Sequence, residues 1–278
     1  MGNNRRIAAV IHTDKNCSDN VRKTVSELTA CRMFDSIVVY RKPDTDFGME
    51  GVLVKDIPAE LDTEPKIRNW INSEYASCGG FLHVIKDDTE ITRPPAEFVS
   101  DVEKMMDVFD YPVWLSTVTD SCNYVYSKYN PRITIAMNRQ DVNDKLGLKT
   151  DICVTSHSNT YWMIYDMPKL VGSNLVRFDD RYTVPMFYII EFLARRRNEK
   201  KRGDMHFMNQ YLTVRSELGV FKQFAGATQK EDDVKTLQEE DKLFKSQDID
   251  FTADMNIDVI LETFWEKLAS KAGVGLSQ

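Results

Sequence analysis

The sequence has no long apolar run, and this absence argues against a membrane-spanning helix. Such a helix needs about 20 consecutive apolar residues, and no run of that kind occurs. The first apolar stretch, Ile7 to Ile11, ends at the polar segment His12 to Lys15 and is too short for a signal peptide. Arg6 stands where myristoylation of Gly2 requires Ser or Thr. We therefore expect a cytoplasmic protein.

The sequence also lacks paired cysteines and an excess of positive charge. Its five cysteines are odd in number and scattered, with no CxxC spacing. This pattern argues against a zinc site or a disulfide framework and favours a reducing compartment. The formal net charge of −7 argues against a generally basic nucleic-acid coat, although a local basic patch is compatible with it.

Short apolar segments alternate with amphipathic ones in the first half of the chain. We expect strands at Ile7–Ile11, Ser36–Tyr40, Gly51–Lys55 and Phe81–Ile85, with helices over 19–32, 65–77 and 92–109. This alternation predicts an α/β fold with a mainly parallel, Rossmann-related sheet flanked by helices.

The second half is mixed in pattern. We expect a strand at Val113–Val118, one or two strands within 153–165 and a helix over Val184–Arg197. Residues 229–250 are dense in charge and read as a mobile linker or a solvated helix, and an amphipathic helix follows over 257–268. We expect residues 1–115 and 116–227 to form two halves of one domain, and 228–278 to form a charged linker and a C-terminal helix.

An acidic run follows the fourth predicted strand, at Lys86 to Glu90. Ligands of parallel α/β sheets bind beyond the carboxyl ends of the strands, so this run is expected at the ligand-binding edge. Asp88 and Glu90 are two residues apart and would point to the same side of an extended backbone. Such carboxylates suit Mg²⁺ or Mn²⁺, which neutralise a departing diphosphate. The alternative is a polar turn that faces water.

The order of these segments resembles the family 2 glycosyltransferases and their relatives with the GT-A fold, over roughly residues 6–200. The similar segments are Ile7–Leu28, Asp35–Asp46, Ile67–Asn69 with Gly79–Gly80, Lys86–Glu90, Ser158–Ile164 and Leu175–Tyr182. The resemblance implies a GT-A-like fold with an acceptor-side half that is mixed, and transfer of a sugar from a nucleotide donor, with a UDP-sugar favoured. It also implies that residues 1–115 bind the nucleotide sugar and that residues 116–227 form the acceptor-binding half.

The resemblance also implies roles for individual residues. The nucleotide-sugar contacts would come from His12, Thr13, Asp44, Arg68 and Asp87, with Arg68 near the phosphates and Asp87 orienting the ribose or sugar. Asp88 and Glu90 would hold Mn²⁺ or Mg²⁺, and His206 would complete the metal shell. For a lone histidine such as His206, a structural role is the alternative.

The sequence departs from the family where inverting members carry a catalytic carboxylate pair, because Pro185–Tyr188 contains no acid. The role of general base would pass to one of four acids: Asp166, Asp179, Asp180 or Glu191. Alternatively, a retaining enzyme lets the departing phosphate take the proton, and the departure leans slightly towards retention.

The acceptor is suggested by one basic segment, with six basic residues in eight: Arg195, Arg196, Arg197, Lys200, Lys201 and Arg202. Such a run is commonly the solvated end of a helix, and it also fits a polyanion such as DNA or an anionic membrane. The size and charge resemble phage enzymes that glycosylate hydroxymethylcytosine in double-stranded DNA. This resemblance implies that the expected cytoplasm would be that of the host. A transferase for cell-surface polysaccharide or lipopolysaccharide is the alternative acceptor class.

Two other functions compete with glycosyl transfer. A sugar-phosphate nucleotidyltransferase would carry a glycine-rich loop after the first strand, and His12–Lys15 has no glycine. A catalytically silent sugar-nucleotide-binding module would keep the fold without the activity. Divalent-dependent hydrolysis of a nucleotide sugar would separate this module from an enzyme.

Overall fold

The structure is a computed structural model of the chain. It describes residues 5–87, 89–91, 94–106, 113–116, 144–147, 152–155, 162–172, 177–183, 187–188, 191–192, 213–216, 221–223, 232–247, 266–267 and 269–275.

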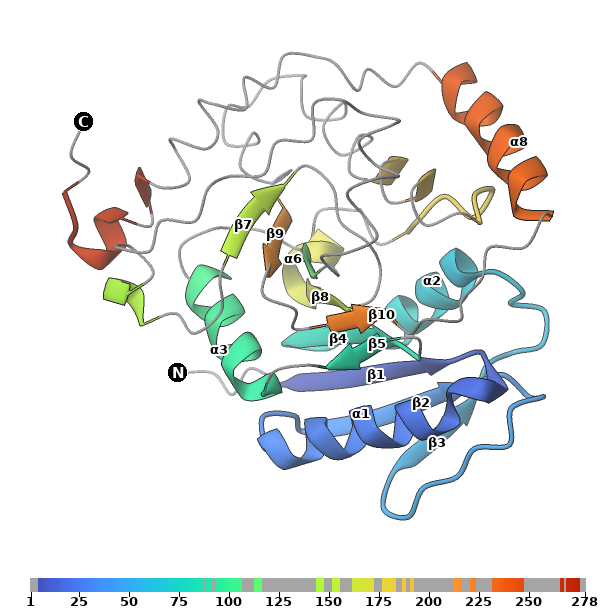
Figure 1. The fold of residues 1–278 in the computed structure, drawn as a ribbon, viewed down its shortest axis with the longest axis horizontal. Helices are drawn as coiled ribbons and strands as arrows, with labels where there is room; N and C mark the ends of the chain where they lie inside the picture. The colour runs from blue at the N-terminus through green and yellow to red at the C-terminus, as the bar shows by residue number, and fades with distance from the viewer. Residues whose placement is uncertain are drawn as a thin grey trace.

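A six-stranded sheet forms the centre of the described part, in the order β3-β2-β1-β4-β8-β6 (Figure 1). Its strands are β1 (Arg6–His12), β2 (Ser36–Arg41), β3 (Leu53–Asp56), β4 (Phe81–Lys86), β6 (Val113–Ser116) and β8 (Trp162–Asp166). β1 to β4 pair in parallel, and β8 runs antiparallel to both β4 and β6. The predicted α/β fold with a mainly parallel sheet is confirmed.

Two smaller pairings lie beside this sheet. β5 (Thr89–Ile91) pairs antiparallel with β10 (Phe221–Gln223), and β7 (Ile152–Thr155) pairs antiparallel with β9 (Thr213–Ser216). Both pairings join a strand of residues 80–160 to a strand beyond residue 210. Residues beyond position 210 therefore pair with strands that come much earlier in the chain.

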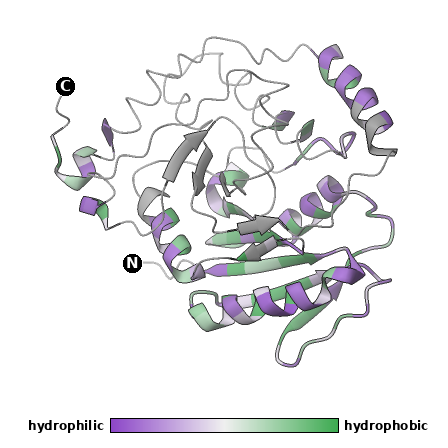
Figure 2. Ribbon diagram, in the orientation of Figure 1, coloured by the Kyte–Doolittle hydropathy of each residue, from purple (hydrophilic) through white to green (hydrophobic). Residues whose placement is uncertain are grey.

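Helices cover both faces of the sheet. α1 (Ser18–Cys31) and α3 (Pro95–Met106) pack on one face, and α2 (Glu64–Glu74) packs on the other (Figure 1). A short 3-10 helix, η1 (Lys15–Cys17), precedes α1, and α6 (Met167–Gly172) follows β8. Figure 2 shows hydrophobic residues along the strands between these layers. Among the described residues, no helix is long and apolar enough to cross a membrane.

The apolar run of β1 is explained by burial on both faces. Ala8 and Val10 belong to the core beneath α1 and α3, whereas Ala9 and Ile11 belong to the core beneath α2. Because side chains alternate between the faces of a strand, a strand covered on both sides has no polar position. The polar residues that end β1 therefore mark the point where the chain leaves the core.

The charge-dense segment beyond residue 229 had two expected forms, a mobile linker and a solvated helix. Residues Asp232–Ser246 form helix α8 rather than a linker. One side of this helix is not solvated: the Phe244 ring lies 5.3 Å from the ring of Phe187 and 6.2 Å from that of Tyr182. Its exposed side carries an ion pair at i,i+4 spacing between Lys235 and Glu239. A few apolar residues at helical spacing suffice to dock a helix whose average composition is polar.

A neutral histidine in the core gives a test of the fold. His83 on β4 is 2% exposed and accepts a hydrogen bond from Trp162 Nε1 at 3.0 Å. Burial, with a smaller effect of Arg6, lowers the pKa of His83 from 6.5 to about 3. The unfolded chain thus binds a proton first as the pH falls below 6.5, so folding is progressively destabilised.

We expect this histidine to contribute about 2 kcal/mol to the loss of unfolding free energy between pH 7.5 and pH 5. Denaturant unfolding of the wild type and of His83→Gln at several pH values measures the effect. The variant should show the flatter dependence in this range, where most carboxyl groups are already ionised. Parallel curves for the two proteins would contradict a buried neutral His83.

Candidate functional site

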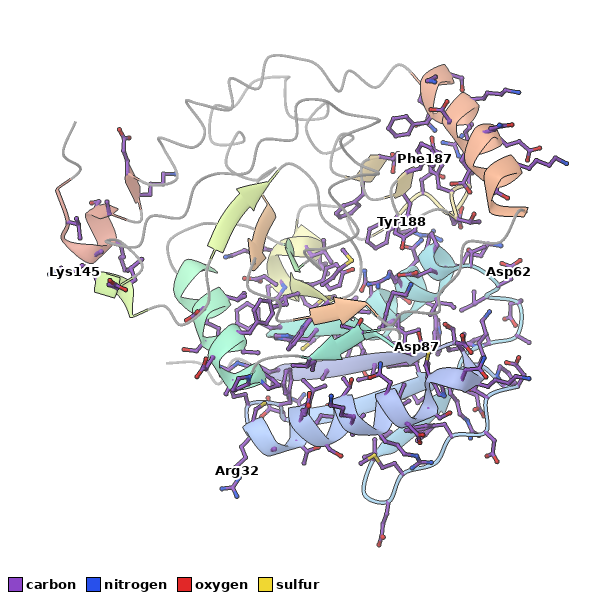
Figure 3. All side chains as sticks on the ribbon, in the orientation of Figure 1. Arg32, Asp62, Asp87, Lys145, Phe187 and Tyr188 are labelled. Carbon is purple, nitrogen blue, oxygen red and sulfur yellow. The ribbon has the colours of Figure 1, made fainter. Side chains whose placement is uncertain are left out.

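The candidate site lies where β1, β2 and β4 end, at the carboxyl edge of the sheet. The segments that follow these strands begin at Thr13, Lys42 and Asp87. Lys42 N donates to His12 O at 3.0 Å, which joins the first two segments. In Figure 3, Asp87 and Asp62 both lie on the right of the view, at the end of the sheet to which the β1 arrow points. The acidic run therefore reaches the edge where ligands of this fold class bind.

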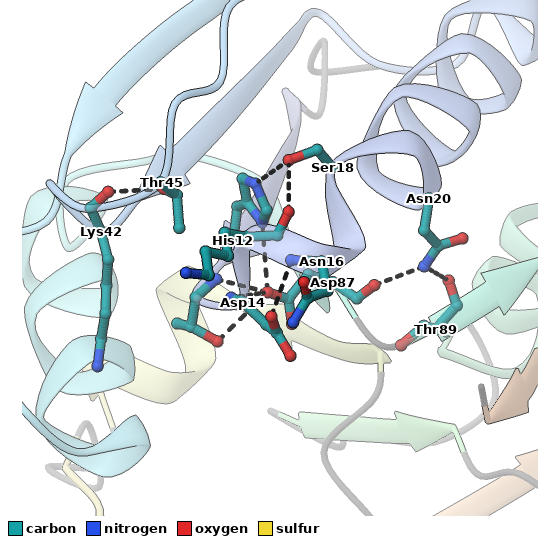
Figure 4. Close-up of polar contacts among 11 residues, drawn as sticks. His12, Asp14, Asn16, Ser18, Asn20, Lys42, Thr45, Asp87 and Thr89 are labelled. Carbon is teal, nitrogen blue, oxygen red and sulfur yellow. Dashed lines mark hydrogen bonds and ion pairs between the residues drawn. The ribbon is translucent and has the colours of Figure 1, made fainter. Parts of the chain in front are cut away.

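Asp87 is the central residue of this edge. Its side chain is 3% exposed, and its Oδ2 atom accepts hydrogen bonds from Thr13 N at 2.5 Å and Asp14 N at 2.7 Å (Figure 4). The Thr13 hydroxyl lies 3.3 Å from the same oxygen. A carboxylate that accepts from successive backbone N–H groups fixes their loop. The segment after β1 and the segment after β4 are thus held as one unit.

His12 supports the same carboxylate from β1. Its ring is fully buried, with Nδ1 3.4 Å from Asp87 Oδ2 and Nε2 3.1 Å from Ser18 Oγ. The order Ser18, His12, Asp87 matches that of a hydrolase triad. However, Ser18 Oγ donates its proton to Lys15 O at 3.1 Å, and Asp87 Oδ2 is occupied by two backbone N–H groups. We therefore interpret His12 as a structural support of the site.

The turn after β2 presents an exposed acid. Thr45 is 1% exposed and closes the turn, because its N and Oγ1 atoms donate to Lys42 O at 2.9 and 2.6 Å. Asp44 precedes Thr45 and is exposed. A ligand at this edge can therefore reach the Asp44 carboxylate, and its contact with a nucleoside stays a prediction.

A partly buried carboxylate, with 17% of its side chain exposed, joins α2 to the end of β4. Glu64 lies 2.9 Å from Lys86 Nζ and 2.7 Å from Arg68 Nε. Burial alone would raise the pKa of Glu64, but the charges of Lys86 and Arg68 outweigh it and lower this pKa to about 2. Glu64 is thus ionised at neutral pH. The same ion pair outweighs burial at Arg68 and raises its pKa.

The two cations differ in their access to a ligand. Arg68, which we expected near the donor phosphates, is fully buried and also contacts Met163 Sδ at 3.2 Å. Lys86 has 18% of its side chain exposed at the carboxyl edge. The sequence interpretation gave Lys86 no role, although its position directly before Asp87 was a usable signal. The phosphate role of Arg68 stays a prediction.

Two of the four candidate bases lie in one segment that bridges α2 and α8. Phe178 exchanges two hydrogen bonds with the Asn69 side chain, and Thr183 donates twice to Glu240. Within this segment, hydrogen bonds from Arg181 lower the pKa of Asp179, and Asp180 is exposed.

The other two candidate bases lie elsewhere. Glu191 is 4% exposed and interacts electrostatically with Arg181. Asp166 pairs in register with Phe81, the first residue of β4. It is therefore separated from Asp87 by roughly 20 Å, the length of six residues of extended chain, and it forms an ion pair with Lys169 at 3.1 Å. The structure does not bring Asp166 to the carboxyl edge.

The remaining predicted residues lie outside the described part of the chain. They are Asp88, the side chain of Glu90, His206 and the six basic residues of 195–202. Among the side chains that the structure does describe, no group of three His, Cys, Asp or Glu residues could hold a metal ion.

Comparison with known proteins gives structural likeness only. No protein-family model matches the chain, and no curated protein matches it. One similar solved structure is glucosyl-3-phosphoglycerate synthase from Mycobacterium tuberculosis with Mn²⁺, UDP and glucosyl-3-phosphoglycerate. Its TM-score is 0.47 at 12% identity, covering 98% of this chain and 82% of that one.

Two further structures show the same level of likeness. The same synthase with phosphoglyceric acid has a TM-score of 0.49 at 11% identity, with coverage of 98% and 82%. A mycobacterial protein has a TM-score of 0.48 at 9% identity, with coverage of 98% and 76%. At these identities and TM-scores, the likeness establishes neither a family nor an activity for this chain.

Proposed function

We propose that this protein is a glycosyltransferase that uses a nucleotide-diphosphate sugar, with a UDP-sugar favoured, and a divalent cation. One observation carries the proposal: Asp87 Oδ2 accepts from both Thr13 N and Asp14 N at the carboxyl edge. This contact joins the loop after β1, which carries Thr13, to the acidic turn after β4. A nucleotide sugar needs this loop and this turn side by side, because the protein must bind its nucleoside and its diphosphate at the same time.

The chemistry of this edge fits a hard divalent cation. The acids that the structure describes there, the exposed Asp14 and Asp44 and the buried Asp87, carry oxygen atoms of the type that Mg²⁺ and Mn²⁺ prefer. Asp88 and Glu90, with His206 as the third ligand, are the proposed holders of the ion. When bound, the cation would offset negative charge on the diphosphate leaving group. Lys86 adds a protein cation at the same edge.

The chain's own residues would divide the remaining work. Thr13 and Asp44 would contact the nucleoside, and Asp87 would fix the loop that carries Thr13. For the general base we favour Asp180 over Asp179, because the hydrogen bonds from Arg181 lower the pKa of Asp179 and weaken it as a proton acceptor. Asp180 is exposed and lies within electrostatic reach of Lys66 in the first turn of α2.

A screen of nucleotide sugars with Mn²⁺ or with EDTA tests the activity. We expect divalent-dependent turnover of at least one UDP-sugar, and Asp88→Ala should lower it at least roughly 100-fold, the upper range for weakened metal sites. Thermal unfolding shows whether the variant is folded. Near-normal activity in folded Asp88→Ala would refute the metal assignment. Absence of turnover in the wild type with every donor would favour a silent binding module.

The same screen decides among acceptors. Its arms are hydroxymethylated, glucosylated and plain double-stranded DNA, glycans of cell-surface type, and phosphoglyceric acid, which one of the similar structures contains. The DNA acceptor is supported only by the composition of residues 195–202. Transfer to DNA that weakens steeply with salt would support it. Transfer restricted to a glycan or to the small acid would reject it.

A further inference from the structure

One side chain of α1 holds the backbone on both sides of the acidic turn. Asn20 Nδ2 donates to Asp87 O at 2.5 Å and to Thr89 O at 2.8 Å (Figure 4). These two carbonyl groups flank Asp88 in the sequence. A single amide group therefore bridges the start and the end of the turn that follows β4.

The orientation of this amide is determined by its two acceptors. Rotating the group by 180° would set Asn20 Oδ1 against two carbonyl oxygens, none of which has a proton to donate. In the observed orientation Asn20 Oδ1 is buried and has no hydrogen-bond partner among the described residues. A buried acceptor without a partner destabilises the folded state. The fold retains the polar group here despite this loss, and both hydrogen bonds that its Nδ2 atom donates go to the turn.

The turn is held from a second element as well. Asp87 accepts from the loop after β1 through its side chain and from α1 through its carbonyl group. Two elements that converge on the carboxyl edge therefore fix one residue at different atoms. Asn20 contacts only backbone atoms of the turn in these bonds and does not itself present an oxygen to the edge.

We propose that Asn20 is a positioning residue for the divalent cation: it sets the backbone of the β4–β5 turn in the geometry that the cation requires. This inference rests on the proposed function. Residues that orient metal ligands without touching the metal typically change metal affinity by roughly 10–100-fold when they are replaced. The effect of Asn20 should accordingly fall on the cation and leave nucleoside recognition unchanged.

Calorimetry of UDP binding by the full chain provides a readout that needs no turnover. UDP affinity is measured in EDTA and at a series of Mn²⁺ concentrations, and the Mn²⁺ concentration that gives half of the gain is compared between proteins. In Asn20→Ala we expect this concentration to rise roughly 10-fold or more, with UDP affinity in EDTA unchanged. The hydroxyl group of Asn20→Ser donates to at most one of the two carbonyl groups. The Mn²⁺ concentration that this variant requires should therefore lie between those of Asn20→Ala and the wild type.

Asn72→Ala is the matched control. Asn72 is 1% exposed on α2, and its Oδ1 atom is likewise buried without a hydrogen-bond partner among the described residues. It interacts with Tyr165 of β8 rather than with the turn after β4. The control should lose stability without any shift in the Mn²⁺ requirement.

The outcomes separate this inference from the function on which it rests. An unchanged Mn²⁺ requirement in folded Asn20→Ala or Asn20→Ser overturns the inference alone. Weaker UDP binding in EDTA, or an equal shift in Asn72→Ala, also overturns it, because the role would then be structural. A wild-type protein whose UDP affinity does not respond to Mn²⁺ overturns the cation site and the inference together, and a wild type that does not bind UDP overturns the proposed function.

Discussion

Replacing Asp87 by alanine is expected to lower kcat/KM for UDP-sugar turnover at least roughly 100-fold, because a shift of about 1 Å in a substrate-positioning group can have that effect. The substitution leaves Thr13 N and Asp14 N without the carboxylate that they share. The loop after β1 would then lose its register with the turn after β4. The kcat/KM of Asp87→Asn should lie between the values of the wild type and Asp87→Ala. An amide oxygen can still accept these hydrogen bonds, but it lacks the charge. Steady-state kinetics with the donor found in the screen measures both.

Asp35→Asn is the control for a carboxylate that accepts a backbone hydrogen bond. Asp35 Oδ2 accepts from Arg6 N at 2.8 Å, next to the first residue of β2 and thus at the opposite edge of the sheet. We expect near wild-type turnover for this variant. If Asp35→Asn and Asp87→Ala lost activity equally, or if folded Asp87→Ala kept its activity, the special role of Asp87 would be wrong.

Replacing Glu64 by glutamine should lower the free energy of unfolding by about 3–5 kcal/mol, as expected when one partner of a buried ion pair is removed. Glu64 faces Lys86 and Arg68 at the same time, and Arg68 is fully buried. The loss of its charge would leave a buried guanidinium without the carboxylate that faces it. Denaturant unfolding at neutral pH measures this change.

An ion pair at the start of the same helix, between Lys66 and the preceding residue Asp62, provides the comparison for Glu64. Asp62 and Lys66 form an ion pair at the same i,i+4 spacing, but 68% of the Asp62 side chain is exposed. Asp62→Asn should therefore leave stability close to that of the wild type, because exposed pairs contribute little. Equal losses in the two variants would show that the burial of Glu64 does not decide the effect.

The direction of the pH effect at Glu64 follows from its lowered pKa. The folded protein holds this pKa at about 2, below the ordinary value of 4.5. The stabilisation by Glu64 is therefore fully present above pH 4.5 and is lost as the pH falls from 4.5 towards 2. Glu64→Gln should lack this part of the acid dependence. Its pH range overlaps that of His83 between pH 4.5 and 3, because the folded pKa of His83 is about 3. The range above pH 4.5 therefore reports His83, and the difference between wild type and Glu64→Gln below pH 4.5 reports Glu64.

The candidate site is built directly on the core of the protein. Asp87 and Lys86 follow the buried strand β4, and each is held by a different neighbour: Asp87 by the loop after β1, Lys86 by Glu64 of α2. Side chains of β4 alternate between the two faces, so consecutive residues reach opposite sides of the sheet. Support from both sides gives the edge the rigidity that recognition of a nucleotide sugar requires.

Local pattern was sufficient for the elements of the first half. The apolar run Ile7–Ile11 and the helical spacing of Val21, Val25 and Leu28 predicted β1 and α1 within a residue or two of their observed bounds. A continuous apolar run marks a strand that is buried on both faces, and apolar residues at helical spacing mark a helix that is buried along one side. Both patterns can be read from the sequence alone. The charge-dense α8 was harder to predict, because its docking depends on Phe187 and Tyr182, which lie far away in the chain.

The sequence by itself determined the α/β class, the carboxyl edge and the acidic residues that follow β4, because strand period and turn composition are local properties. Only the tertiary structure decided which partners those residues have. Asp87 joins the loop after β1, Asn20 bridges the turn, Arg68 is buried, and Asp166 lies at the far edge. These contacts join residues that are far apart in the sequence, and their geometry depends on strand order and register, which no local pattern encodes.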